Sequence, residues 1–581
     1  ENNDEEYIKK NANKCIGTLN ENDQTALMIA AQNGFTNLIY ALQLEKKIQN
    51  KLGNTALMYA SANNKYNCCK MLLEELKIQN NEGFTALMIA SASGNQACVH
   101  FLRDYELRMV SYKQYTALQL ACAQSHPHIV ELLLDEADVA GLDGKTALMH
   151  AAESGSVECC QQLEALATQI DTKGDTALIL CLECLIRIQS KQLPQSILNN
   201  YHATINFLLP FEFDQAKTDG TTVLMLCASA KLPPIQLLKK QIKLKNLLLQ
   251  TALMFAADAS NFEMAEELTD EVGNKDSEGK TALMYACQTG NQQLVDLLYS
   301  FEGQIVDKKQ NNCLHYAAMA PNSDICLQMK PVWGQKVNSI GEPPIFNAIR
   351  NKRLANCTVL MESAHIVDKS SMTALMVAAE ADNADVVKMF SKLANKINQF
   401  GQTASMICGE RGSIRFFREI VQIERQTADK NVLTEAIKFN QFKLVKLIAD
   451  LARSNQSAAN VDQVYESKVC EQCKKLICMK INGESVLHQA IYAGSNECIQ
   501  ILSYCIEDTN DVTPLMKAVQ REGITPQSIS MLSTIYGGKQ IQLQKGQKGM
   551  TALMIASMQS FENKDVINIL LELEAEQKDD S

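Results

Sequence analysis

The clearest candidates for chemistry in this sequence are three cysteines, Cys470, Cys473 and Cys478. Two thiolates separated by two residues form half of a typical zinc site, which His488 or Cys498 would have to complete. The alternative is that residues 461–479 form one added helix, in which Cys470 and Cys473 share a buried face. Because no second Cys-x2-Cys pair lies nearby, the sequence favours the helix and predicts neither a metal nor a cofactor.

Signatures of catalysis are missing from the sequence. It contains no Gly-rich phosphate loop, no His-Glu-x-x-His zinc motif and no Gly-x-Ser-x-Gly nucleophile motif. A net charge of −11 argues against general nucleic-acid binding, which needs a basic surface. No run of apolar residues is long enough to span a membrane. We therefore predict a protein that is not an enzyme and that binds neither nucleic acid nor membrane.

The elements that position all these residues come from a recurring segment, Thr-Ala-Leu-Met-x-Ala. Clear copies begin at Thr25, Thr55, Thr85, Thr146, Thr251, Thr281, Thr373 and Thr551. Degenerate copies begin at Thr116, Thr176, Thr222, Asn312, Pro343, Thr403, Asn431, Ser485 and Thr513. Most neighbouring copies lie about 30 residues apart, and a fixed period of that length is typical of a repeat protein. The sequence therefore predicts about 17 stacked units.

Residues 83–110 illustrate how one unit should fold. Thr85 suits the N-cap of a first helix, which the good helix formers of residues 86–90 continue. Gly94 ends that helix. A second helix follows, with a predicted buried face of Cys98, Val99, Phe101 and Leu102. Ten units carry a Gly two residues before the motif, which should supply the positive φ of a tight turn.

Helix, turn, helix and a Gly-turned finger, in that order, resemble the ankyrin repeat. Residues 513–516, Thr-Pro-Leu-Met, and residues 312–315, Asn-Cys-Leu-His, are close to the family's Thr-Pro-Leu-His element. The Thr-Ala-Leu-Met variant is similar to ankyrin-repeat proteins of diplomonad protists. Because Met usually replaces the family's His, we expect apolar packing to stand in for the Thr–His side-chain bonding. The resemblance implies an all-α solenoid of short helix-turn-helix units.

Thirteen of the 20 cysteines occupy positions that the unit should bury. In second helices these are Cys68, Cys69, Cys98, Cys159, Cys160, Cys326, Cys357 and Cys498. In first helices they are Cys122, Cys181, Cys227, Cys287 and Cys408. We interpret them as small buried hydrophobic residues in a reducing compartment. The acidic start of the chain does not have the pattern of a signal peptide, so we expect a cytoplasmic protein.

Paired acids also follow second helices, as at Asp135 and Glu136. Two close carboxylates are the groups that general acid–base catalysis uses. At this position of the unit a solvated surface is the expected role.

The residue just before the motif is expected to lie on the finger. Phe84 and Tyr115 hold that position in successive units, and Lys145 holds it in the next. Because aromatic anchors dominate interface energies, we predict that Phe84, Tyr115 and Lys145 bind a partner. The alternative is that each side chain packs on the adjacent finger.

The resemblance implies a function in protein binding. We expect a scaffold or adaptor that joins protein partners through the fingers and the concave face. One alternative is a structural component of a cytoskeletal assembly, with a filament such as a microtubule as the partner. A second alternative is the targeting subunit of an enzyme complex.

Three long intervals between motifs set the predicted domain boundaries. Between Thr176 and Thr222 we expect an extended first helix, a break near Pro194 and a second helix through residues 205–209. The predicted order is a partial capping repeat at 1–24, repeats at 25–176, an enlarged repeat at 177–221, repeats at 222–430, a degenerate repeat with an extra helix at 431–484, and repeats with a terminal cap at 485–581.

Overall fold

The computed structural model describes residues 16–189, 191, 194–424, 431–453, 473–478, 480–481, 484–493 and 495–503. These residues form helices joined by loops, and one short antiparallel pair of strands, β1 (Lys480–Ile481) and β2 (Glu484–Ser485). The chain divides into two compact units, one of residues 1–283 and 296–302 and the other of residues 284–295 and 303–581. The predicted all-α repeat fold is confirmed in both units.

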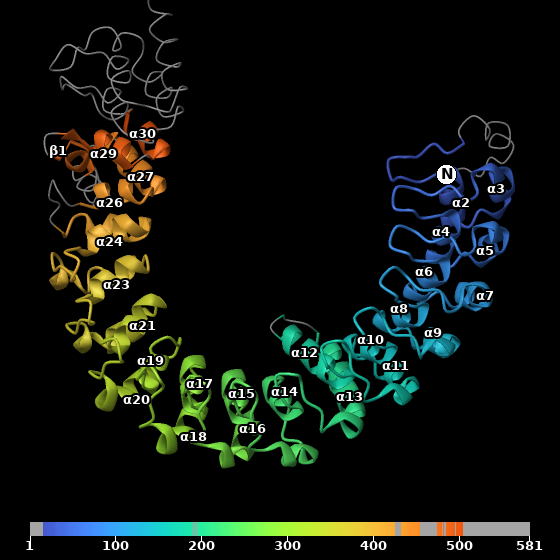
Figure 1. Cartoon of the computed structure of the whole chain (residues 1–581), viewed down its shortest axis with the longest axis horizontal. Helices are drawn as coiled ribbons and strands as arrows, with labels where there is room; N and C mark the ends of the chain where they lie inside the picture. The colour runs from blue at the N-terminus through green and yellow to red at the C-terminus, as the bar shows by residue number, and fades with distance from the viewer. Residues whose placement is uncertain are drawn as a thin grey trace, which may run out of the picture. The chain divides into compact units, whose positions relative to one another are not determined.

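In the first unit, one helix begins directly after each motif position, and successive first helices pack on one another. Figure 1 shows them as a row, with the fingers extending from their side of the repeats. They are α2 (Ala26–Asn33), α4 (Ala56–Ala62), α6 (Ala86–Ala92), α8 (Ala117–Ala123), α10 (Ala147–Glu153), α12 (Ala177–Gln189), α14 (Val223–Ser229) and α15 (Ala252–Ala259).

Second helices form another row alongside the first helices, on the side away from the fingers (Figure 1). They are α3 (Thr36–Ala41), α5 (Tyr66–Met71), α7 (Gln96–Glu106), α9 (Pro127–Val130), α11 (Val157–Gln162), α13 (Gln195–Glu212) and α16 (Phe262–Glu267). Short 3-10 turns extend or replace several of them: η2 (Gln43–Glu45), η3 (Leu73–Glu75), η4 (Glu131–Glu136), η5 (Glu164–Leu166), η6 (Gln236–Gln241) and η7 (Thr269–Glu271). Helices α17 (Ala282–Thr289) and α18 (Gln292–Glu302) contribute residues to both units.

The second unit repeats the same plan, mostly from degenerate motifs. Its first helices are α19 (Cys313–Ala317), α21 (Pro344–Arg350), α23 (Ala374–Glu380), α24 (Ala404–Arg411), α26 (Val432–Lys438) and α29 (Val486–Ala493). Its second helices and 3-10 turns are α20 (Ser323–Trp333), α22 (Leu354–Val359), η8 (Met361–Ser363), η9 (Ala384–Val386), η10 (Ser391–Leu393), α25 (Ile414–Ile420), α27 (Phe442–Arg453) and α30 (Asn496–Ser503).

The motif Thr caps the first helix in most of the described repeats, as predicted, although Thr251 makes no such side-chain bond. The hydroxyl of Thr85 accepts the N–H of Met88 at 3.4 Å, which satisfies one free donor of the first turn. The motif Met is buried, in accord with the expected apolar packing, and in several repeats it also accepts a hydrogen bond. The sulfur of Met149 accepts the N–H of Thr146 at 3.5 Å, and the same bond recurs at Thr25, Thr222 and Thr373. The thioether thus acts as the acceptor in a capping box, because its sulfur is a weak hydrogen-bond acceptor.

The finger turn has a positive φ two residues before the motif. Gly53, Gly83 and Gly144 confirm the prediction, and no Cβ fits at Gly83 without meeting the backbone of Tyr112 at 2.5 Å. Gln114 and Leu249 hold the same conformation although they are not Gly. Because side chains strain in this region, the turn is imposed by its neighbours and not by local preference alone.

The core consists of residues from both helices of every repeat. All thirteen cysteines that were predicted to be buried are buried free thiols. In the α7 helix, Cys98, Val99 and Leu102 are buried as predicted. Phe101 is only half-buried, which corrects that prediction, and its ring meets Tyr66 edge-on at 5.9 Å.

A series of buried glutamates links neighbouring repeats. Glu106 accepts the N–H of Leu87 at 2.7 Å in its own repeat and the N–H of Lys77 at 2.8 Å in the preceding connector. Equivalent paired bonds are made by Glu45, Glu75, Glu136, Glu212, Glu271, Glu302 and Glu424. We call these eight residues the buried glutamate series. The predicted solvated surface is therefore right for Asp135, which is exposed, and wrong for Glu136, whose carboxylate is buried because it satisfies two backbone donors.

The enlarged repeat has the predicted form. α12 is extended to Gln189, Pro194 precedes α13, and α13 includes residues 205–209. The motifs at Thr513 and Thr551, most of the partial repeat at 1–24 and most of the added helix at 461–479 lie outside the described residues.

Candidate functional site

The fingers carry a set of exposed apolar side chains at their tips. In the first unit the tip residues Leu52, Tyr112 and Leu142 are 64%, 65% and 61% exposed. Leu247 and Leu248 extend the set in a later finger, and Ile340 and Phe400 are exposed tips of the second unit. We call these seven residues the finger-tip set. A tip has no core to fill, so large apolar residues there are available for contact with another molecule.

Hydrogen bonds hold the finger tips in fixed positions. In one finger the Asn50 Oδ1 accepts the N–H of Leu52 at 3.1 Å and that of Asn54 at 2.8 Å. The next finger is tied to it by a bond from the Asn81 N–H to the Leu52 carbonyl at 3.1 Å. An equivalent bond joins Tyr112 to Glu82 at 3.2 Å. Because the backbone is braced from finger to finger, the tips are pre-organised for binding.

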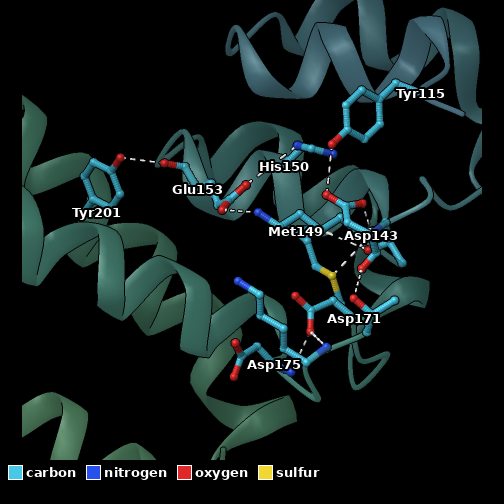
Figure 2. Close-up of polar contacts among 12 residues, drawn as sticks. Tyr115, Asp143, Met149, His150, Glu153, Asp171, Asp175 and Tyr201 are labelled. Carbon is cyan, nitrogen blue, oxygen red and sulfur yellow. Dashed lines mark hydrogen bonds and ion pairs between the residues drawn. The ribbon is translucent and has the colours of Figure 1, made fainter. Parts of the chain in front are cut away.

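Tyr115 packs on the adjacent finger. Figure 2 shows its hydroxyl donating to Asp143 Oδ2, at 2.9 Å, while its ring meets His150 edge-on with centroids 5.3 Å apart. Gly141 makes this possible, since a Cβ there would lie 2.6 Å from the Tyr115 ring. Neighbouring fingers have Asn50, Asn80 or Asp171 at the equivalent place. The Tyr115 ring therefore lies where neighbouring fingers have a turn-forming Asn or Asp side chain.

Lys145 and Phe84 are the other two predicted partner-binding residues, and their side chains do not take part in the Tyr115–Asp143 bond. The Lys145 ammonium makes an ion pair with Glu153, at 2.5 Å, and both side chains are partly exposed. Phe84 is half-buried, and its N–H donates to Asn80 in its own finger. The structure thus brings Tyr115 and Lys145 into one neighbourhood around α10, through His150 and Glu153, and leaves Phe84 one finger earlier.

Lys145 and Glu153 belong to a surface that recurs along the repeats. It is made by the residue before the motif and by the fourth and seventh residues after it, and we call it the finger-side face. The first and last of these positions also meet in other repeats, as Gln24 meets Gln32 at 2.7 Å and Gln402 meets Glu410 at 3.0 Å. The fourth position is apolar in early repeats, as at Ile29 and Ile89, and is His150 on α10.

Several charged residues of this face lie near α10 and α12, and the same positions carry the Glu342–Arg350 ion pair in the second unit. Asp175 precedes α12, Glu183 lies on α12, and Lys217 from the following finger makes an ion pair with Glu183. Burial raises the pKa of Asp175, an effect that Lys217 opposes and Glu183 reinforces. Burial also lowers the pKa of His150, which favours the neutral imidazole.

Asp143 differs in the direction of its shift. Burial alone would raise the pKa of its carboxyl, but bonds from the Lys145 N–H and the Tyr115 hydroxyl outweigh burial and lower that pKa. Burial and the bond to Asp143 raise the pKa of Tyr115 in turn. The Tyr115–Asp143 pair is thus a neutral phenol on a carboxylate, an arrangement that stabilises the finger.

The proposed zinc ligands are described only in part. Cys473 is buried, Cys478 is exposed, and Cys470 lies outside the described residues. His488 Nδ1 is 2.9 Å from the Ser485 hydroxyl, and the Cys498 sulfur is 3.9 Å from Asn440 Oδ1. Within the described residues, no group of three or more His, Cys, Asp or Glu side chains is placed to hold a metal ion.

Sequence reasoning missed two sets of residues. The finger-tip set lies two or three residues before the position that the sequence singled out, and the alternation of Leu and Tyr with polar residues there would have been a weak signal. The buried glutamate series had a stronger signal, because most of its members recur about 20 residues after the motif.

Comparison with known proteins supports the fold directly. The family model of ankyrin repeats in three copies matches residues 1–81, 74–143, 253–339 and 487–581, which is more than half of the chain. Among curated proteins, no match to the chain was found. In the described part of the chain no helix is both long and apolar enough to cross a membrane. Repeats of this kind are protein-interaction modules, and the chain belongs to the ankyrin-repeat family.

Proposed function

We propose that this protein is a non-catalytic scaffold or adaptor that binds other proteins through its finger tips and finger-side face. The observation that carries the proposal is the finger-tip set, whose members are large, apolar and exposed on braced turns. Aromatic and aliphatic anchors on a rigid backbone give much binding energy for little lost conformational entropy.

Phe84, Tyr115 and Lys145 have a specific place in this proposal. Tyr115 and Lys145 are already engaged with Asp143 and Glu153, so they support the binding surface more than they project from it. Tyr115→Ala should then lower stability, and a loss of stability with intact binding would remove Tyr115 from the list of anchors. Phe84 makes no such side-chain bond among the described contacts, so Phe84→Ala tests directly whether its ring binds a partner.

The experiment is cross-linking mass spectrometry of the full chain in its native cell extract. The test variant replaces two finger tips, Tyr112→Ser with Leu142→Ser. The control variant makes the same two changes, Tyr40→Ser with Leu44→Ser. Tyr40 and Leu44 are both 66% exposed but lie on α3 and η2, away from the fingers. Loss of partner cross-links in the test variant alone supports the proposal, because the two variants remove equal apolar area. Equal loss in both variants, or none in either, contradicts it.

The identities of the cross-linked proteins separate the alternatives. One or two soluble partners support an adaptor. Tubulin or other filament proteins cross-linked along many repeats, and retained through high-salt extraction, support a structural component of a cytoskeletal assembly. A single enzyme as the partner supports a targeting subunit.

A cytoplasmic location accords with this function. Fifteen of the described cysteines are buried free thiols, which persist in a reducing compartment.

A further inference from the structure

Two thiols of neighbouring repeats are in contact in the first unit. Cys69 lies on α5 and Cys98 on α7, which are neighbouring second helices (Figure 1), and their sulfur atoms are 3.7 Å apart. Both side chains are fully buried. The S–S distance of a disulfide is about 2.0 Å, so the two sulfurs need to approach by roughly 1.7 Å to form one. The fold thus brings together two thiols that are 29 residues apart in the sequence.

The surroundings of the two thiols fix their positions and connect them to the surface. The Asn95 side-chain amide donates to the carbonyls of Ser61 and Ala62, at 2.7 and 2.9 Å, and so joins the two repeats. The hydroxyl of the same Ser61 is 3.7 Å from the Cys69 sulfur. The Cys98 sulfur is 3.7 Å from the Oδ1 of Asn64, which is an exposed residue. Rotation of the Asn64 side chain therefore opens a short path from solvent to the Cys98 sulfur.

The two thiols differ in how readily each loses its proton. A bond from the Cys69 S–H stabilises the thiolate of Cys98 and lowers the pKa of that thiol, although burial opposes the change. The same bond raises the pKa of Cys69, and burial adds to the rise. Cys98 is also the third residue of α7, and the free N–H groups of a first helical turn favour a negative charge. Because the thiolate is the reactive form of cysteine, Cys98 is the nucleophile of the two.

We propose that Cys69 and Cys98 form a disulfide when the protein meets hydrogen peroxide, and that this bond links the repeats that begin at Thr55 and Thr85. The Cys98 thiolate attacks one peroxide oxygen, the O–O bond breaks, and Cys98 becomes a sulfenic acid. The departing hydroxide takes up the proton that Cys98 had lost and becomes water. The Cys69 sulfur then attacks the sulfenic sulfur, the S–O bond breaks, and the second hydroxide leaves as water with the Cys69 proton. Two thiols are thus oxidised by two electrons, and the peroxide is reduced to two waters.

The disulfide would restrain one repeat of the array. It closes a segment that contains the finger before Thr85 and the α6 helix. Because each repeat is held by its immediate neighbours, a covalent link between two of them limits local opening of that segment. In a reducing compartment such a bond is transient, as redox-sensing disulfides are. This inference does not rest on the proposed binding function; it adds a response to an oxidant.

The experiment treats the reduced full chain with hydrogen peroxide, blocks the remaining thiols with N-ethylmaleimide and digests the protein without reductant. Mass spectrometry then locates the linked peptides. Cys69→Ala removes one partner. Cys68→Ala is the matched control, because Cys68 is the adjacent buried thiol of the same helix. A parallel sample of the unchanged protein is oxidised in concentrated urea, where the contact between the repeats is lost, so the test does not depend on the variants alone.

Four results are expected. The folded wild-type chain and Cys68→Ala should contain the link between residues 69 and 98. Cys69→Ala should lose it and retain a sulfenic acid on Cys98, which dimedone labels, because the second thiol is missing. In urea the links should spread over other cysteines, since the fold no longer selects the pair. Hydrogen exchange of residues 86–92 should slow after oxidation of the folded chain and recover when dithiothreitol reduces the bond.

Absence of a link between residues 69 and 98 in the oxidised folded chain would overturn the inference. A link that persists in Cys69→Ala would also overturn it, because Cys68 would then be the partner of Cys98. The same mixture of links from the folded and the urea-treated chain would show that the fold does not select these thiols. Unchanged hydrogen exchange after complete linking would overturn the claim that the disulfide restrains the repeat.

Discussion

At the scale of single residues, two carboxyl groups of the first unit differ in how many hydrogen bonds they accept. Tyr115 is accommodated because Gly141 has no side chain, and its hydroxyl satisfies Asp143. Asp175 has no such donor for its Oδ1 within the described residues. The two carboxyls precede neighbouring first helices, yet their pKa values shift in opposite directions, because only Asp143 is well supplied with hydrogen bonds.

Asp175→Asn should therefore raise stability. The raised pKa of Asp175 means that its ionised form is disfavoured in the folded protein, so a neutral side chain of the same shape should stabilise it by roughly 1 kcal/mol at neutral pH. Thermal unfolding of the variant and the wild type, followed by circular dichroism, measures the change. A lower unfolding midpoint for the variant would mean that the ionised carboxylate stabilises the fold. It would contradict the interpretation of Asp175 as an unsatisfied group.

At the scale of the elements, the finger turn requires a positive φ, which residues other than Gly adopt at a cost in free energy. Gln114 has a φ of 62°, where most repeats have Gly, and its side chain is exposed. Gln114→Gly should stabilise the protein by about 1 kcal/mol, because the left-handed conformation costs an L-residue roughly that amount. Lys113→Gly is the control: the adjacent residue is not at positive φ, so Gly there should destabilise through added freedom of the unfolded chain. Chemical denaturation of both variants checks the opposite signs.

Three members of the buried glutamate series, Glu75, Glu106 and Glu136, have raised pKa values because they are buried, and they predict a dependence of stability on pH. Burial raises the pKa of Glu106, against two backbone bonds that lower it. The native carboxyl therefore holds its proton to a higher pH than the unfolded chain does. Its linkage contribution to the free energy of unfolding is fully present below the unfolded pKa, about 4.3, and is lost as the pH rises through the folded pKa.

Glu106→Gln should thus lower the free energy of unfolding by about 1–3 kcal/mol. The NH2 group of the introduced Gln would face one of the two backbone N–H groups that the Glu106 carboxylate accepts. The loss should be larger near pH 5 than near pH 7. Denaturation midpoints at both pH values test this. Gln241→Glu is the reciprocal control, because Gln241 accepts from the Leu224 N–H and donates to the Phe213 carbonyl. A loss for Glu106→Gln that shrinks toward low pH would show that the sign is wrong.

At the scale of the whole molecule, most stabilising contacts join one repeat to the next. Stability in such an array is close to a sum of local terms, so a defect should spread to neighbours and fade with distance along the chain. Leu87 is fully buried in α6, and Leu87→Ala should cost about 2–5 kcal/mol locally. Hydrogen exchange measured by mass spectrometry should then show lost protection in residues 55–136 and unchanged protection in residues 374–420.

Leu375→Ala supplies the matched control in the second unit. Leu375 occupies the equivalent position of α23 and is also fully buried. Its substitution should reverse the pattern of exchange. If either variant loosened both units equally, the protein would unfold as one cooperative body.

The repeat, its helices and much of its core can be predicted from the order of the amino acids. The motif predicted the N-cap at Thr85 and the buried cysteines, and Pro194 marked the break in the enlarged repeat. These features depend on residues within a few positions of one another, so the chain order reveals them.

The partners of individual side chains, in contrast, depend on how the repeats stack. Glu136 is buried because the N–H groups of Arg108 and Leu118 come together around it, across 28 and 18 residues of sequence. Asp175 remains unsatisfied and Tyr115 lies on Gly141 for the same kind of reason. Burial and hydrogen bonding at these sites depend on distances between repeats, which arise when the helices stack and have no counterpart in the local pattern of residues.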